Sequence, residues 1–227
     1  FIMGDDKDGK LGDAPKHKVQ ITKGFWLGRY EVTNHQWNAV FSNDPMMKPA
    51  IRAAIAGRDI YETKIPATGH SWLRCIEFCS KLSKIDGNRY RLPYEAEWEY
   101  AARKGATPEQ LHKAHLLLPD LPPWVAMATR PVGKSGEENF LGLFDMFGNV
   151  CERCSDYYDP NYYRQSPRVD PKGPLKGTHR VIRGGCKNTP KTDNLITKRS
   201  YGKFDRQYRT DPLVDTNLEV GFRVICE

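Results

Sequence analysis

The stretch YRLPYEAEWEYAAR, residues 90–103, decides most about the fold, because it joins a strand-like start to a helical run across one proline. Three carboxylates follow Pro93, where negative charge complements the dipole of a helix N-terminus. Gly105 is a candidate residue to end that helix. The acids Glu95, Glu97 and Glu99 suggest paired-carboxylate catalysis, but two of their spacings fall on different helix faces, which argues against it.

Upstream of this stretch, residues 17–30 read HKVQITKGFWLGRY and alternate apolar and polar side chains, as a half-buried strand does. The next residues, EVTNHQWNAVF (31–41), place apolar side chains near helical spacing. Thr33 and Asn34 are suited to cap that helix. We therefore expect a strand followed by a first short helix.

A further helix is predicted in SWLRCIEFCSKLSKI (71–85), with Ser71 as its cap. Cys75 and Cys79 stand four residues apart on its apolar stripe. Unligated cysteine is among the most buried residue types, so we interpret both as small buried hydrophobes.

Composition predicts one domain over residues 1–227. The chain has 39% hydrophobic residues, enough for one sizeable core, and 19 Gly and 16 Pro spread along it imply many turns. This argues against a helical bundle or a doubly wound α/β fold. No run reaches the roughly 18 apolar residues that a membrane span needs. Phe1 opens directly on a predicted strand, so we expect the segment to come from a longer protein.

The net charge of +7 is concentrated, since residues 164–209 hold thirteen Lys or Arg against three Asp. Such a region is either a solvated face or a surface that attracts anionic ligands. No DNA- or RNA-binding motif supports nucleic acid as the partner. Signatures of serine hydrolases, zinc proteases and P-loop enzymes are also absent from the sequence.

Seven motifs, taken in order, resemble the sulfatase-modifying-factor family, whose enzymes generate formylglycine. They are FIMG (1–4), GFWLGRYEVTNHQW (24–37), SWLRCIEFC with YRLPYEAEWEYAAR, PVG (131–133), GLFDMFGNVCE (142–152), RVIRGG (180–185) and GFRV (221–224). The resemblance covers nearly the whole chain. It implies an α+β, C-type-lectin-like fold that is loop-rich, with short antiparallel strands and two or three helices.

The resemblance also implies where catalysis would lie. Family enzymes use two cysteines beyond the R-G-G motif to bind copper and oxidise a substrate cysteine, and those positions fall here on Thr189 and Asn194. A rival alignment, through TKRSYG, gives Thr197 and Gly202 instead. Either way both sulfurs are missing, and thiolates are what select Cu(I). We therefore expect no copper and no ordinary oxidase reaction.

A calcium loop of the family matches residues 145–152. The resemblance implies carboxylate ligands from Asp145 and Glu152 and backbone carbonyls from Gly148 and Val150. Such hard oxygen donors suit Ca²⁺. The alternative is that these acids cap a turn. A second calcium site of some relatives is not carried over, because the region before PVG lacks the acids.

Three cysteines replace residues that relatives carry beside the usual active site: Cys151, Cys154 and Cys186. A disulfide from Cys186 to either of the others, a new thiolate metal site, and three buried thiols all remain open.

The leading hypothesis is a non-catalytic binding or scaffolding module for a protein or an anionic ligand. Aromatic residues interleaved with cations make such a surface, and the candidates here are Tyr157, Tyr158, Lys198, Arg199, Tyr201 and Arg206. The alternatives are a copper oxidase with relocated cysteines and a retroelement-diversified ligand binder. The resemblance favours a cell-envelope location and leaves the oligomeric state open.

Overall fold

The computed structural model describes residues 1–6, 15–41, 64–103, 129–134, 138–185, 196–202 and 220–227. Within them lie the helices α1 (Asn34–Phe41), α4 (Trp72–Asp86) and α5 (Glu95–Arg103) and the short 3-10 helix η1 (Tyr162–Arg164). The strands are β1 (Ile2–Met3), β2 (His17–Lys18), β3 (Trp26–Leu27), β4 (Tyr90–Arg91), β5 (Cys151–Tyr157), β6 (Arg180–Arg183), β7 (Ser200–Tyr201), β8 (Val220–Gly221) and β9 (Ile225–Cys226). This confirms the expected α+β class with few, short regular elements.

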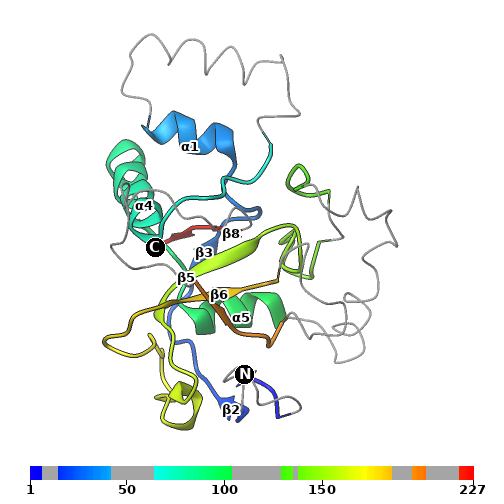
Figure 1. The fold of residues 1–227 in the computed structure, drawn as a ribbon, viewed down its shortest axis with the longest axis vertical. Coiled ribbons are helices and arrows are strands. Elements are labelled where there is room, and N and C mark those ends of the chain that lie inside the picture. Colours follow the sequence, from blue (N-terminus) through cyan, green and yellow to red (C-terminus); the bar gives the residue numbers. More distant parts are fainter. Residues whose placement is uncertain (7–14, 42–63, 104–128, 135–137, 186–195, 203–219) are drawn as a thin grey trace.

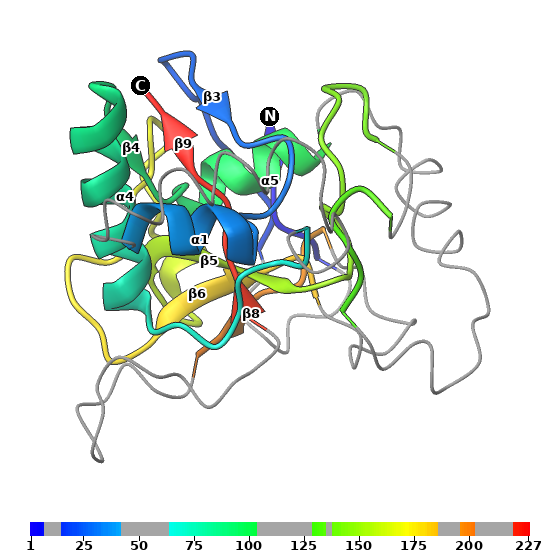
Figure 2. The same ribbon diagram turned by 90° about the horizontal axis from the view of Figure 1, so that it is seen from above.

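A four-stranded sheet in the order β7-β6-β5-β8 occupies the centre of the molecule (Figure 1). β5 pairs antiparallel with β6, and β6 pairs antiparallel with β7. β5 pairs parallel with β8, however, so the antiparallel expectation does not hold for this pair. A three-stranded sheet, β3-β9-β4, and the hairpin-like pair β1-β2 complete the described strands. α1 and α4 pack together on one side of the central sheet, and α5 lies apart from them (Figure 2).

The helix boundaries follow the predicted caps. Thr33 accepts from the Gln36 N–H (3.3 Å), and the Gln36 side chain accepts from the Thr33 N–H (2.9 Å), which is a capping box. Ser71 accepts from the Arg74 N–H (3.3 Å) at the start of α4. Gly87, in the left-handed region at φ 85°, ends that helix. The candidate stop at Gly105 lies outside the described residues.

The single strand expected over residues 17–30 is two short strands instead. β2 pairs with β1, and β3 pairs with β9, in different sheets. Between them the Gln20 N–H donates to Arg168 (2.8 Å), and the Asp170 N–H donates back to Gln20 (2.9 Å). The chain therefore leaves one sheet, bridges to residues 168–170, and enters another.

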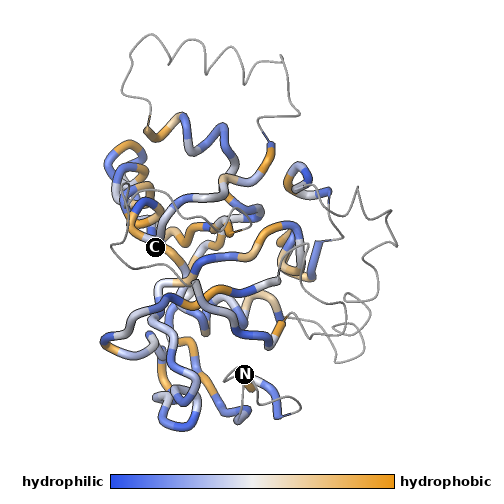
Figure 3. The backbone as a smooth tube through the Cα atoms, viewed as in Figure 1, coloured by the Kyte–Doolittle hydropathy of each residue, from blue (hydrophilic) through white to orange (hydrophobic). Residues whose placement is uncertain are grey.

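Two main apolar clusters hold these elements together, and Figure 3 shows apolar stretches on α4 and along the central strands. One cluster packs α1 and α4 around Phe78 and Phe222, and it includes Cys75 and Cys79. Both cysteines are buried, as expected, and burial raises the pKa of Cys79 to about 12. The other packs α5 on β5 around Trp98. No helix in the described ranges is long and apolar enough to cross a membrane.

Candidate functional site

The loop that leads into β5 has a left-handed backbone at three positions. Asp145, Gly148 and Asn149 have φ of 55°, 87° and 54°. The Gly148 N–H donates to the Gly184 carbonyl (3.0 Å), which ties this loop to the turn after β6. Asn149 also accepts from the Arg130 N–H (2.9 Å). The loop is therefore held in a fixed, sharply wound conformation.

Below this loop, Arg223 and Glu152 form a fully buried ion pair. The Arg223 Nε and Nη2 atoms donate to the two oxygens of Glu152 at 2.7 and 2.5 Å. Trp98 Nε1 donates to the same carboxylate at 2.7 Å. Arg223 further donates to the carbonyls of Gly28 and Phe144, both at 3.0 Å. Glu152 is thus largely saturated by donors, with lone-pair capacity left mainly at Oε1.

Glu31, next to this pair, carries a buried acceptor with no donor. Its Oε1 accepts from Asn149 Nδ2 (3.1 Å), but its Oε2 has no hydrogen-bond partner among the described residues. Burial raises the pKa of Glu31 well above its ordinary value, and Asp145 and Glu152 raise it further, against the opposing effect of Arg223. Among the described residues, the carboxylates of Glu31, Asp145 and Glu152 therefore all lie in the electrostatic field of one guanidinium, that of Arg223.

This arrangement bears on how a cation would be held. In the described residues, no three His, Cys, Asp or Glu side chains are placed to share one metal ion. A metal at the loop would therefore take at most two carboxylates, with backbone oxygens such as those of Gly148 and Val150. The donorless Oε2 of Glu31 is a buried oxygen that a hard cation would satisfy, so the oxygen donors present fit Ca²⁺.

Without added metal, Glu31→Gln is expected to raise the free energy of unfolding near pH 7 by about 1 kcal/mol. A carboxyl whose folded-state pKa is raised contributes stability below its ordinary value of 4.5 and loses it as pH rises through the folded-state pKa. The glutamine keeps an acceptor for Asn149 and carries no charge. Urea unfolding in EDTA near pH 7 and near pH 4 measures this, and the gain should shrink at the lower pH. Equal loss of stability at both pH values would contradict it.

An aromatic patch, defined as Tyr158, His179 and Tyr201, lies at the edge of the central sheet. The Tyr158 and Tyr201 rings are 4.6 Å apart between centroids, and His179 meets Tyr201 edge-on at 5.0 Å. The Tyr158 N–H donates to the His179 carbonyl (2.8 Å), which fixes the two segments together. Tyr201, on the edge strand β7, is 40% exposed. The patch therefore presents a fixed aromatic surface to solvent.

The other predicted surface residues are placed differently. Tyr157 stacks on the Arg180 guanidinium at 3.4 Å, and Arg180 also lies 3.6 Å from the Trp72 ring, so Tyr157 has a packing role. Lys198 is half-buried. Arg206 lies outside the described residues.

Arg199 is in the core rather than on the predicted surface. It is 0% exposed, and its Nε and Nη2 atoms donate to Glu95 at 2.7 and 3.0 Å. Its guanidinium also lies 5.0 Å from the Tyr158 ring. Desolvation of a charge is offset when the charge is paired, so Arg199 stays ionised and supports the patch from beneath.

Cys151 and Cys154 lie on opposite faces of β5, because side chains alternate along a strand. Cys151 packs with Ile182 and Val220, whereas Cys154 packs in the cluster of Trp98. Burial raises the pKa of Cys154 well above its ordinary value, and nearby carboxylates raise it further, which disfavours the thiolate that binds metals. Cys186, Thr189 and Asn194 lie outside the described residues, so the pairings with Cys186 stay predictions.

Sequence reasoning missed a buried ion network under the patch. Arg183 donates to Glu99 (2.5 Å) and Glu95 (3.2 Å), and Arg103 donates to Glu99 (2.7 Å). Glu95 and Glu99 of α5 are therefore ion-pair partners of Arg183, which is 88 and 84 positions away, and Glu99 also pairs with Arg103 in the same helix. One signal was available: three acids in a helix that also carries buried Trp98 and alanines leave little polar face for solvent.

Comparison with known proteins agrees with this architecture. The family described as sulfatase-modifying factor enzyme 1-like domain matches residues 1–227. Serine/threonine-protein kinase Pkn1 of Chlamydia trachomatis is 31% identical over 82% of this chain and 32% of its own length. Formylglycine-generating enzyme of Streptomyces coelicolor is 42% identical over 42% of this chain and 35% of its own. The solved structure of Treponema denticola variable protein 1 superposes with a TM-score of 0.73 at 23% identity, covering 100% of this chain and 91% of that one.

The fold is that of a C-type-lectin-like domain of the sulfatase-modifying-factor type. The chain belongs to the sulfatase-modifying factor enzyme 1-like domain family. It spans about a third of the length of these two curated relatives, 32% and 35%. In Pkn1 the matching segment is thus part of a longer protein.

Proposed function

We propose that this domain is a non-catalytic binding or scaffolding module whose loop at 145–152 is stabilised by calcium. The observation that carries the proposal is the aromatic patch: Tyr158, His179 and Tyr201 contact one another at an exposed sheet edge above the buried Arg199–Glu95 pair. Rigid aromatic rings give contact area with little loss of conformational entropy, as binding surfaces require. The absence of cysteine at Thr189 and Asn194 supports the non-catalytic role.

The ligand we propose is a protein segment that carries an anionic group. Residues 164–209 have a surplus of ten positive charges, of which Arg183 and Arg199 are used in buried ion pairs, and Lys198 stands three residues before Tyr201 in the sequence. A sulfated tyrosine joins an aromatic ring to an anion, so it is a suitable probe of both features.

Binding is tested by fluorescence anisotropy with a peptide that contains a sulfotyrosine and with its unmodified counterpart. Tyr201→Ser is expected to weaken binding of the sulfated peptide about tenfold. Leu175→Ser is the matched control, because Leu175 is fully exposed and outside the patch. Equal binding by both variants would remove the patch from the proposal.

Calcium is expected to raise the thermal unfolding midpoint. A ligand at a hundred times its Kd stabilises by about 2.7 kcal/mol, which for a chain of this size is roughly 5 to 10 °C. Asp145→Asn should abolish the shift, since Asp145 is 4% exposed and lies in the same electrostatic field as Glu31 and Arg223. Glu138→Gln removes the same charge from an exposed pair with Arg29 and should leave the shift intact. Calorimetry with calcium and with EDTA decides between these results.

An oxidase with relocated cysteines is tested by loading with Cu(I) and measuring bound copper. We expect far less than one equivalent of bound copper per chain, because Cys151 and Cys154 face opposite sides of β5 and the Cys154 thiol resists deprotonation. Bound copper that is lost in Cys151→Ser or Cys186→Ser would contradict the binding-module proposal and favour an oxidase.

A further inference from the structure

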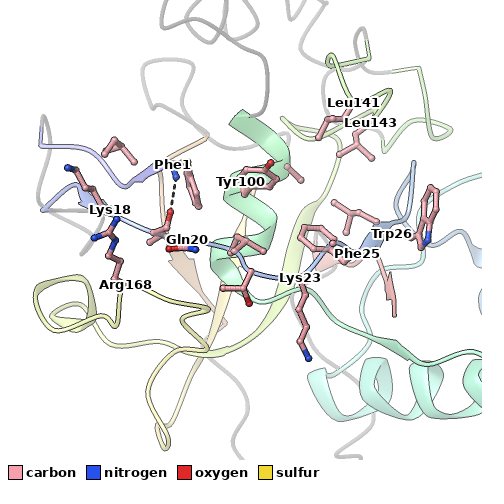
Figure 4. Close-up of a pocket in the computed structure, with 17 residues that line it drawn as sticks. Phe1, Lys18, Gln20, Lys23, Phe25, Trp26, Tyr100, Leu141, Leu143 and Arg168 are labelled. Carbon is pink, nitrogen blue, oxygen red and sulfur yellow. Dashed lines mark hydrogen bonds between the residues drawn. The ribbon is translucent and has the colours of Figure 1, made fainter.

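A groove of about 930 Å³ lies beside α5, and none of the residues that line it belongs to the aromatic patch. Its walls come from β1, from the segment between β2 and β3, and from Tyr100 of α5, and Leu141 and Leu143 form its far rim (Figure 4). Its volume is within the range of ligand pockets, roughly 300 to 1,000 Å³. Nothing in the proposed function uses this groove.

One end of the groove exposes large apolar side chains. Trp26 is 81% exposed and Leu141 is 48% exposed, and Figure 4 shows Phe25 next to Trp26. Ile2, at 44% exposure, lines another wall. Contiguous exposed apolar groups with a tryptophan are typical of interaction sites, because their burial against a partner releases water.

The other end is positively charged. Lys18 and Arg168 lie together there, and Gln20 lies between that end and Tyr100 (Figure 4). Neither cation has an ion-pair partner within the part of the chain that the structure describes. Lys23 also lines the groove but lies in the field of Asp170 and Glu227. The lining contains no Asp or Glu, so the groove complements an anion at this end.

We propose that this groove binds an extended peptide segment of a partner protein, with a large apolar side chain at the Trp26 end and carboxylates at the Lys18 and Arg168 end. A peptide fits better than a lipid chain, because the Gln20 side chain places a polar amide on the groove between its two ends (Figure 4). The inference stands on residues outside the aromatic patch, so it does not depend on the proposed function.

The probe is a labelled extended peptide in which leucine and phenylalanine are followed by glutamates. Its counterparts have lysine in place of each glutamate or serine in place of each apolar residue. Anisotropy with the whole chain should show binding of the first peptide and at least tenfold weaker binding of both counterparts. Trp26→Ser and the double variant Lys18→Glu, Arg168→Glu should each weaken binding of the first peptide about tenfold. Added salt should also weaken binding of this peptide to the parent chain.

Matched controls separate this groove from the rest of the surface. Lys84→Glu, at an exposed position of α4, and Leu175→Ser, at a fully exposed position outside the groove, should bind the first peptide like the parent chain. All substituted groups are exposed, and unchanged thermal unfolding would confirm intact folding. Equal binding of the glutamate and lysine peptides would overturn the proposal. Trp26-dependent binding to anionic phospholipid vesicles without peptide binding would overturn it too, in favour of a lipid surface.

Discussion

Arg223→Met is expected to destabilise the domain by about 3 to 5 kcal/mol, because it leaves buried carboxylates without their guanidinium. The Arg223 side chain is 0% exposed and binds both oxygens of Glu152 as well as the carbonyls of Gly28 and Phe144. Glu31 and Asp145 lie in the same field. Methionine fills a similar volume, so the measured loss would reflect the lost donors and charge. Such a loss is a large part of the roughly 5 to 15 kcal/mol that stabilises a typical domain.

Urea unfolding followed by circular dichroism, in EDTA, measures this effect. Arg29→Met is the matched control, because Arg29 also pairs with a glutamate, Glu138, at 2.8 Å. Both side chains of that pair are exposed, Arg29 by 57% and Glu138 by 51%. Exposed pairs contribute about 0 to 1 kcal/mol, so the control should be nearly neutral. Adding Glu152→Gln to Arg223→Met should restore part of the loss, since the amide oxygen still accepts from Trp98. A loss below about 1 kcal/mol in Arg223→Met would show that water reaches this cluster.

The sequence predicted the local elements well where capping chemistry marks them. Ser71 and Thr33 each cap the helix that follows, and apolar periodicity placed Cys75 and Cys79 in the core. Residues 17–30 were read as one strand because alternation continues through them. Their division between two sheets depends on a bridge to residues 168–170, and no local pattern encodes a partner so distant in sequence.

The candidate site was predictable in its loop but not in its ion pairs. Family motifs place Asp145 and Glu152, and the structure brings them near Arg223 and Glu31. Arg199 was expected at the surface because charged residues are mostly exposed. Its burial depends on Glu95, 104 positions away, which offers both carboxylate oxygens. Sequence spacing says nothing about such a contact until the fold is known.

Glu95→Gln is expected to destabilise the domain by about 3 to 5 kcal/mol, because Glu95 is the shared acceptor of two buried arginines. Arg199 donates to both of its oxygens, Arg183 donates at 3.2 Å, and the Tyr163 hydroxyl donates at 3.2 Å. Glutamine keeps the shape but offers one acceptor oxygen and brings two N–H donors toward the guanidinium groups. Arg199 supports Tyr158, so the aromatic patch should lose its fixed geometry as well.

The pH dependence distinguishes this electrostatic effect from a simple packing defect. Burial alone would raise the pKa of Glu95, but Arg199 and Arg183 outweigh it and hold the pKa below its ordinary value of 4.5. A depressed folded-state pKa gives stability that is present above 4.5 and is lost as pH falls through the folded-state value. The parent chain should therefore lose stability on acidification faster than Glu95→Gln, and the two unfolding curves should converge. Glu77→Gln, which removes a half-exposed partner of Arg74 on α4, should run parallel to the parent. A constant difference between parent and Glu95→Gln from neutral to acidic pH would assign the loss to packing and not to charge.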